Sequence, residues 1–244
     1  MSFLERILAE KRRNLFDGLG EYASPRVIQA MKEIPRTKFV HPINLPRTYN
    51  DEVLSIPSVS WLYKRATISQ PGVVAEMTEL LDPQPNESVL EIGTASGYQA
   101  AVLSKLVKNV VSVEIIPGLA KQARRRFKNL GIDNVKVVLA DGSIPFTGEK
   151  VFDKILVTAS VFPHFVPLFM PALKENGVCV LPVGGDGGDE RFCKLTRIRR
   201  KGKGYFVEKA TPGFVFVLME GAGGWEGLNA AYLDFLHNDF FRLG

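Results

Sequence analysis

Glycine, acidic and hydroxyl-bearing residues stand at the ends of short apolar runs. They are the loop Gly93–Gly97, Glu114, Asp141-Gly142 and Thr158-Ala159. Glycine permits a tight turn and lets a ligand approach the backbone closely. A carboxylate about 20 residues after such a loop can accept hydrogen bonds from two ribose hydroxyls, as Glu114 would. The acid at the end of the third run, Asp141, could receive an adenine amino group. The spacing therefore predicts a nucleoside-binding site.

The loop itself indicates which nucleoside. It is not G-x-G-x-x-G, because Ala95 stands where a dinucleotide-binding loop usually has its second glycine. A pyrophosphate needs that close approach, whereas S-adenosylmethionine has no phosphate, and Glu91 suits its cationic methionyl group. We therefore favour S-adenosylmethionine over NAD. The alternative is a βαβ unit that binds nothing, with Gly93 and Gly97 as plain turn residues; the acids at two later strand ends argue against it.

The elements that must position these groups follow from hydrophobic periodicity. Helices are predicted over 96–107 and from Pro117 to a stop at Gly131. Short apolar runs predict buried strands at 88–92, 110–114, 135–139, 152–157 and 177–181. Strands that alternate with helices form a mostly parallel sheet with helices on both faces, and its ligands sit beyond the carboxyl ends of the strands.

Composition bounds the class of protein. The 244 residues are 45% hydrophobic and 23% charged with a net charge of +5, which is typical of a soluble globular chain and permits an acidic partner. No apolar run approaches the roughly 20 residues that span a bilayer, and charged residues within the first six disfavour a signal peptide. We expect a cytoplasmic protein, reduced core thiols at Cys179 and Cys193, and no metal, since CxxC and HExxH are absent.

Several segments, in the same order along the chain, resemble the protein-L-isoaspartate (D-aspartate) O-methyltransferase family. The similarity spans about residues 24 to 218, and "TIS-P" together with "LEIGT-SGYQAAVL" is more specific than a generic methyltransferase loop. The segments are Met31–Val40 with its "IPRTKFV", Thr67-Ile68-Ser69-Gln70-Pro71, Val89–Ala101, Asp141-Gly142, Val157-Thr158-Ala159 and Leu181-Pro182-Val183-Gly184.

The resemblance implies a Rossmann-like class I methyltransferase fold. Residues 1–80 would form an N-terminal helical and active-site loop region, 81–220 the core with a late antiparallel strand near 214–217, and 221–244 a helical tail. The reaction would move a methyl group from S-adenosylmethionine, leaving S-adenosylhomocysteine, onto the α-carboxylate of an isoaspartyl or D-aspartyl residue. The ester would then collapse to a succinimide, which starts protein repair.

The resemblance also assigns site residues. Ser69 would be the catalytic residue and would orient the acceptor carboxylate; as a helix N-cap, its other interpretation, it would have only a structural role. A carboxylate is already ionised at neutral pH, so no base is needed. Peptide substrate would be bordered by Ser69, Val183, Gly184 and Gly185. The cofactor would be bound by Thr67, Ile68, Glu91, Gly93, Thr94, Ser96, Gly97, Glu114, Ile115, Asp141, Gly142 and Thr158.

Two segments depart from the family pattern. Residues 57–66 make a longer link before the active-site segment, and Trp61, Tyr63, Lys64 and Arg65 in it could form either a peptide-binding lid or an ordinary loop. The tail after Gly221 is also longer and has an aromatic helical pattern. Relatives with such changes esterify an aspartyl side chain of a dedicated peptide, which is the alternative function.

Basic runs on the second helix and on a late hairpin suggest a further alternative, an RNA methyltransferase. The runs are Lys121, Arg124, Arg125, Arg126 and Lys128, then Arg197, Arg199, Arg200, Lys201 and Lys203. A solvated helix face and a basic sheet edge explain them more simply. A third class is a binding module without turnover, against which the intact Ser69 and acids argue. The sequence indicates neither the oligomeric state nor the native substrate.

Overall fold

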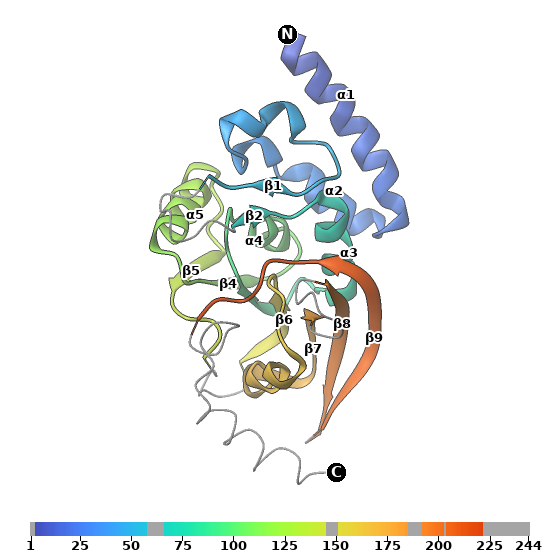
Figure 1. Cartoon of the computed structure of the whole chain (residues 1–244), viewed down its shortest axis with the longest axis vertical. Helices are drawn as coiled ribbons and strands as arrows, with labels where there is room; N and C mark the ends of the chain where they lie inside the picture. Colours follow the sequence, from blue (N-terminus) through green and yellow to red (C-terminus); the bar gives the residue numbers. More distant parts are fainter. Residues whose placement is uncertain (1–2, 58–65, 145–150, 185–191, 203, 222–244) are drawn as a thin grey trace.

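The computed structural model describes residues 3–57, 66–144, 151–184, 192–202 and 204–221. In these residues the centre is a seven-stranded sheet of order β5-β4-β3-β6-β7-β8-β9, in which the first five strands are parallel and the last two antiparallel (Figure 1). The strands are β3 (Ser88–Ile92), β4 (Asn109–Glu114), β5 (Val135–Leu139), β6 (Phe152–Val157), β7 (Leu173–Gly184), β8 (Phe192–Lys201) and β9 (Gly204–Val215). The predicted strands and their parallel order are confirmed.

One face of the sheet carries the α-helices. The helices α3 (Pro71–Leu81), α4 (Tyr98–Ser104) and α5 (Pro117–Asn129) share one buried cluster with the N-terminal helices α1 (Phe3–Gly18) and α2 (Pro25–Glu33). The second face buries a separate cluster under the 3₁₀-helices η4 (Pro163–Leu168) and η5 (Met170–Ala172). Strand β3 contributes side chains to both clusters, because successive side chains of a strand point to opposite faces: Val89 belongs to the first cluster, and Leu90 and Ile92 belong to the second.

The remaining elements precede α3. The 3₁₀-helix η1 (Leu19–Glu21) lies between α1 and α2. Between α2 and α3 come the 3₁₀-helices η2 (Arg36–Lys38) and η3 (Pro42–Arg47), followed by the antiparallel pair β1 (Leu54–Ser55) and β2 (Thr67–Ile68). Strand β2 brings the chain directly to the carboxyl edge of the main sheet, where α3 begins. No described helix is long and apolar enough to cross a bilayer.

Proline starts three of the described α-helices, at Pro25 in α2, Pro71 in α3 and Pro117 in α5. Pro71 and Pro117 occupy the first turn of α3 and α5, where a missing N–H costs nothing. The N-cap of α3 is Gln70, not Ser69. The capping interpretation of Ser69 is therefore wrong, and the Asp51 carboxylate instead accepts a hydrogen bond from Gly72 N at 2.6 Å.

The carboxyl half differs from the prediction in two places. Strand β7 runs over 173–184 rather than 177–181, because Leu173 pairs with Phe152 of β6 at one end and Gly184 pairs with Cys193 of β8 at the other. The basic residues of β8 do not form a sheet edge, since β9 covers that strand. Arg197 and Arg199 both pair with Glu208 on β9, and Arg200 is buried. Cys179 and Cys193 are buried and free, as predicted. The predicted tail helix lies outside the described residues.

Gly97 fits where a larger residue does not. Its φ is +87°, and an added Cβ would lie 2.8 Å from Cζ of Phe127 in α5. We expect Gly97→Ala to lower the free energy of unfolding by about 1–3 kcal/mol, measured by urea denaturation. Gly18, with φ −78° at the end of α1 and nothing within 4 Å, is the matched control. Gly18→Ala should stabilise by up to about 1 kcal/mol; equal effects of the two substitutions would contradict this account.

Candidate active site

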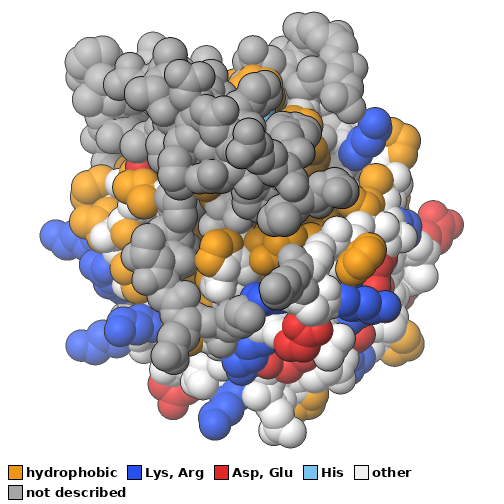
Figure 2. Space-filling view, turned by 90° about the horizontal axis from the view of Figure 1, so that it is seen from below, with side chains coloured by type: hydrophobic (Ala, Val, Ile, Leu, Met, Phe, Trp, Pro, Cys, Tyr) orange, Lys and Arg blue, Asp and Glu red, His pale blue; other side chains and the backbone are white. Residues whose placement is uncertain are grey.

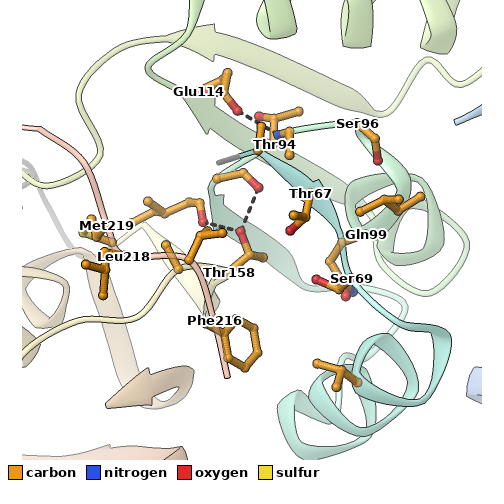
Figure 3. A pocket seen from close by; sticks show the side chains of 18 of the residues that line it. Thr67, Ser69, Thr94, Ser96, Gln99, Glu114, Thr158, Phe216, Leu218 and Met219 are labelled. Atoms are coloured by element: carbon orange, nitrogen blue, oxygen red, sulfur yellow. Dashed lines mark hydrogen bonds between the residues drawn. The ribbon is translucent and has the colours of Figure 1, made fainter. Parts of the chain in front are cut away.

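A cavity of about 960 Å³ opens at the carboxyl edge of the sheet. Most of its lining comes from four regions: the ends of β3, β4 and β6, the segment 66–70, the start of α3 and α4, and residues 213–220, which begin at the end of β9 (Figure 3). This is the position that the parallel order predicts for a ligand. Most of the predicted site residues line it: Thr67, Ile68, Ser69, Gly93, Thr94, Ser96, Glu114, Ile115, Gly142 and Thr158.

The loop after β3 alternates in and out of the left-handed region. Gly93, Ala95 and Gly97 have φ of +98°, +46° and +87°. An added Cβ on Gly93 would lie 2.3 Å from Oγ1 of Thr158, so glycine is required there. Thr158 Oγ1 donates to the carbonyls of Ile92 and Gly93 at 3.0 and 2.8 Å. Thr158 therefore holds the loop, and its hydroxyl can only accept from a ligand.

Glu114 is anchored by the same loop. Its carboxylate accepts hydrogen bonds from Ala95 N at 2.7 Å and from Ile116 N at 2.9 Å. Burial raises its pKa, and these backbone donors act against the rise. Each carboxylate oxygen can accept a further hydrogen bond. The geometry thus leaves Glu114 able to receive a pair of neighbouring hydroxyls, as its position in the sequence predicts.

Glu91 lies behind the cavity wall. It is completely buried and accepts from Ser112 Oγ, whose oxygen is 2.5 Å from Thr94 Oγ1. Its Oε1 is buried without a partner, and burial raises its pKa to about 8. The predicted direct contact with a cationic ligand therefore becomes an indirect one, since the hydroxyls of Ser112 and Thr94 stand between Glu91 and the cavity.

Four other predicted residues do not line the cavity. Asp141 accepts from the backbone N and Oγ of Ser143 at 2.9 and 2.5 Å, so it holds the turn whose Gly142 and Ser143 form the wall. Gly97 packs against α5. Val183 and Gly184 belong to the end of β7, where Val183 bridges to Val161. Gly185 and the loop residues 58–65 lie outside the described residues.

Ser69 lies across the cavity from Thr94 and Glu114 (Figure 3). It follows β2, where Thr67 pairs with Ser55, and its carbonyl accepts from Arg36 Nη2 at 2.8 Å. Figure 3 shows Ser69 and Thr67 on the same wall, with Gln99 beside Ser69. Gln99 Nε2 donates to Thr78 Oγ1 at 2.9 Å, which leaves its amide oxygen available. The helical pattern of α4 gives no sign that Gln99 would face a site.

The cavity has one further wall, which we call the C-terminal strap (residues 213–220). It begins at the end of β9 and crosses the carboxyl edge as the orange-red segment in Figure 1. Two hydrogen bonds fix it to Ser160, in the loop after β6: Ser160 N donates to Val217 O at 2.8 Å, and Met219 N donates to Ser160 O at 3.0 Å. The resemblance implied an antiparallel strand near 214–217 but gave this segment no part in the site, and β9 ends at Val215.

The ionisable groups on the described wall are acidic. Glu114 and Glu220 line the cavity, whereas no Lys, Arg or His does so among the described residues. Within those residues there is also no group of three or more His, Cys, Asp or Glu that could hold a metal ion. The cavity can therefore bind hydroxyl-bearing and cationic groups through its carboxylates, next to a polar wall of Thr67, Ser69 and Gln99.

Comparisons with known proteins agree on one family. The family model described as "Protein-L-isoaspartate(D-aspartate) O-methyltransferase" matches residues 10–223. A protein-L-isoaspartate O-methyltransferase of Dictyoglomus thermophilum is 39% identical over 218 residues, which are 88% of this chain and 94% of the relative. Protein-L-isoaspartate O-methyltransferase 2 of Rhodopseudomonas palustris is 45% identical over 179 residues, 73% and 78% of the two chains. A solved protein-L-isoaspartate O-methyltransferase superposes with a TM-score of 0.72 at 28% identity, covering 87% of this chain and 66% of that one.

The buried Glu91 makes stability depend on pH. Its pKa is about 8 in the folded chain against an ordinary value of 4.5. Between these values the folded state binds the extra proton, so the contribution of Glu91 to stability falls as pH rises, by at most about 1.4 kcal/mol per pH unit. We expect Glu91→Gln to become progressively more stable relative to the unmodified chain from pH 5.5 to 8 in urea denaturation. Parallel pH profiles would contradict this assignment.

Proposed function

The chain belongs to the protein-L-isoaspartate (D-aspartate) O-methyltransferase family, and on that premise we propose that it methylates the α-carboxylate of L-isoaspartyl or D-aspartyl residues. The methyl donor is S-adenosylmethionine, and the substrates are peptides and proteins that carry these damaged residues. The methyl ester then closes to a succinimide, which can reopen to normal aspartate.

One observation supports this reaction above the others: a nucleoside side and an acceptor side meet in one cavity. The loop 93–97 and Glu114 form the first side, and Ser69 with Thr67 forms the second. We infer that Glu114 binds the ribose hydroxyls and that Gly142 and Ser143 border the adenine. These residues fit the cofactor for two reasons. Gly93 has no side chain, so a ligand can approach the backbone of the loop, and Glu91 has a buried carboxyl oxygen without a hydrogen-bond partner behind Thr94.

The chain itself needs to do little acid–base chemistry. Bound S-adenosylmethionine supplies an activated methyl group on a sulfonium, and the acceptor carboxylate is already anionic at neutral pH. The contribution of the protein is therefore to hold the acceptor oxygen in line, and such positioning can supply about 7–11 kcal/mol. We infer that the Ser69 hydroxyl donates to the acceptor carboxylate and fixes its direction.

The C-terminal strap excludes water from this step. Its side chains Phe216, Leu218 and Met219 lie on the cavity wall facing Thr158 (Figure 3). Excluding water strengthens hydrogen bonds and charge interactions inside the cavity. A pre-closed apolar wall suits an alkyl transfer that uses no water molecule.

The alternative functions gain no support. The two curated relatives named above are both called protein-L-isoaspartate O-methyltransferases, and neither name refers to a dedicated peptide or to RNA. Two arginines of the predicted basic hairpin are already paired with Glu208. On the face shown in Figure 2, Lys and Arg side chains are interspersed with Asp and Glu side chains.

The direct test compares three acceptors with labelled S-adenosylmethionine: an isoaspartyl peptide, its aspartyl twin and bulk RNA. We expect base-labile label on the isoaspartyl peptide alone. Label on the aspartyl twin would instead indicate esterification of a side chain, and label on RNA would overturn the proposal.

Removing the Glu114 carboxylate tests the nucleoside side. We expect Glu114→Ala to weaken S-adenosylmethionine binding by about 1.5–3 kcal/mol in calorimetry, the usual cost of losing hydrogen bonds to a charged group. Glu208→Ala, which removes a carboxylate from the β8–β9 hairpin, is the control and should leave the affinity unchanged. Wild-type affinity in Glu114→Ala would refute the ribose assignment.

Removing the Ser69 hydroxyl tests the acceptor side. We expect Ser69→Ala to lower kcat about 10-fold or more, since one oriented hydrogen bond is worth about 1–2 kcal/mol. Affinity for S-adenosylmethionine should stay near normal, and Ser55→Ala on the neighbouring strand should change neither quantity. A large loss of cofactor affinity in Ser69→Ala would place this serine on the nucleoside side instead.

A further inference from the structure

The proposed acceptor is an anion, and it enters a cavity whose described wall carries no cationic side chain. Moving a carboxylate out of water is costly unless a charge or hydrogen bonds compensate it. Ser69 and Thr67 offer only hydroxyls, and the acidic groups on the wall, Glu114 and Glu220, provide no positive charge to compensate an anion. A positive charge directly behind the acceptor wall would therefore matter for acceptor binding.

Arg36 places such a charge there. Its side chain is buried, with 1% exposed, and Nη2 donates to the Ser69 carbonyl at 2.8 Å. Nε donates to Thr48 O at 3.0 Å, and the guanidinium lies 4.7 Å from the ring centroid of Tyr98, which itself lines the cavity. These contacts tie η2, η3 and the start of α4 to the segment that carries Ser69.

The charge of Arg36 is incompletely compensated. Its Nη1 is buried without a hydrogen-bond partner. Burial lowers the pKa of Arg36, whereas Tyr98 and, to a smaller extent, Asp51 favour its charged form. The Asp51 carboxylate already accepts a hydrogen bond from Gly72 N. Burial raises the pKa of Tyr98 to about 12, so this ring stays neutral. Arginine keeps its proton even when buried, and a net positive charge therefore remains one hydrogen bond behind Ser69.

We propose that Arg36 is a positioning residue for the acceptor: its guanidinium fixes the Ser69 backbone and places the positive charge that favours the acceptor carboxylate. This inference rests on the proposed function. The two effects separate kinetically, because the charge acts on binding of the anionic peptide and hence on its KM. The hydrogen bond to the Ser69 carbonyl acts on the orientation of Ser69 and hence on kcat.

The experiment measures kcat and KM for an isoaspartyl peptide, together with the Kd for S-adenosylmethionine, in Arg36→Met and Arg36→Lys. For Arg36→Met we expect kcat/KM to fall about 30-fold or more, with a raised peptide KM and a cofactor Kd within about 3-fold of wild type. Arg36→Lys keeps a charge but cannot span two carbonyls, so KM should recover towards wild type while kcat stays about 10-fold low.

Arg200→Met is the matched control. Arg200 is also buried, donates to the Leu173 carbonyl and lies over the Tyr205 ring, but it belongs to β8 and neither of these partners lines the cavity, unlike Ser69 and Tyr98 beside Arg36. Its replacement should cost stability without changing the peptide KM.

The outcomes separate the two proposals. A wild-type chain that leaves isoaspartyl peptide unmethylated refutes the proposed function itself. If wild type is active, the Arg36 inference is overturned when Arg36→Met keeps wild-type KM and kcat, or when Arg200→Met shifts them equally. Should Arg36→Met fail to bind the cofactor through loss of the fold, Arg36→Lys decides, and a wild-type kcat in that variant overturns the inference.

Discussion

The site depends on one packing constraint, the contact between the Gly93 backbone and the Thr158 hydroxyl at the carboxyl ends of β3 and β6. No side chain fits between them, since an added Cβ would come within 2.3 Å of the hydroxyl. The resulting left-handed turn points Ala95 N at Glu114 and so holds a buried carboxylate at the cavity wall. The backbone conformation of the loop 93–97 therefore shapes this part of the cavity. The same loop orients the Glu114 carboxylate through Ala95 N.

The acceptor side is built in a different way, from segments that are distant in the sequence. Ser69 follows strand β2 at the edge of the sheet, and Arg36 in η2 donates a hydrogen bond to its carbonyl. The C-terminal strap forms the opposite wall of the cavity. The strap depends on two backbone hydrogen bonds to Ser160. This division suits a methyltransferase, because the donor needs a rigid binding surface whereas the acceptor is part of a much larger chain.

Local pattern was sufficient for the sheet and for the positions of the loop 93–97 and Glu114 at its carboxyl edge. Strands such as 88–92 are short apolar runs bounded by glycine, and Glu114 stands at a fixed distance from the loop. Features that arise from long-range pairing were not predictable in this way. The two ends of β7 are set by its pairing with β6 and β8, and the burial of Arg200 follows from the strand β9 that covers β8. Gln99 faces the cavity where α3 lies across from α4. Asp141 is a further example. It follows β5 as the sequence predicts, but its carboxylate accepts a hydrogen bond from Ser143 Oγ and does not line the cavity.

The most direct measurement is a crystal structure of the chain with S-adenosylhomocysteine. This account predicts its ribose hydroxyls on Glu114, its adenine beside Gly142 and Ser143, and its sulfur directed towards Ser69. The reverse orientation, with the purine at Ser69, or a ligand outside this cavity would contradict the central claim that the left-handed loop presents a methyl donor to an acceptor held beside β2.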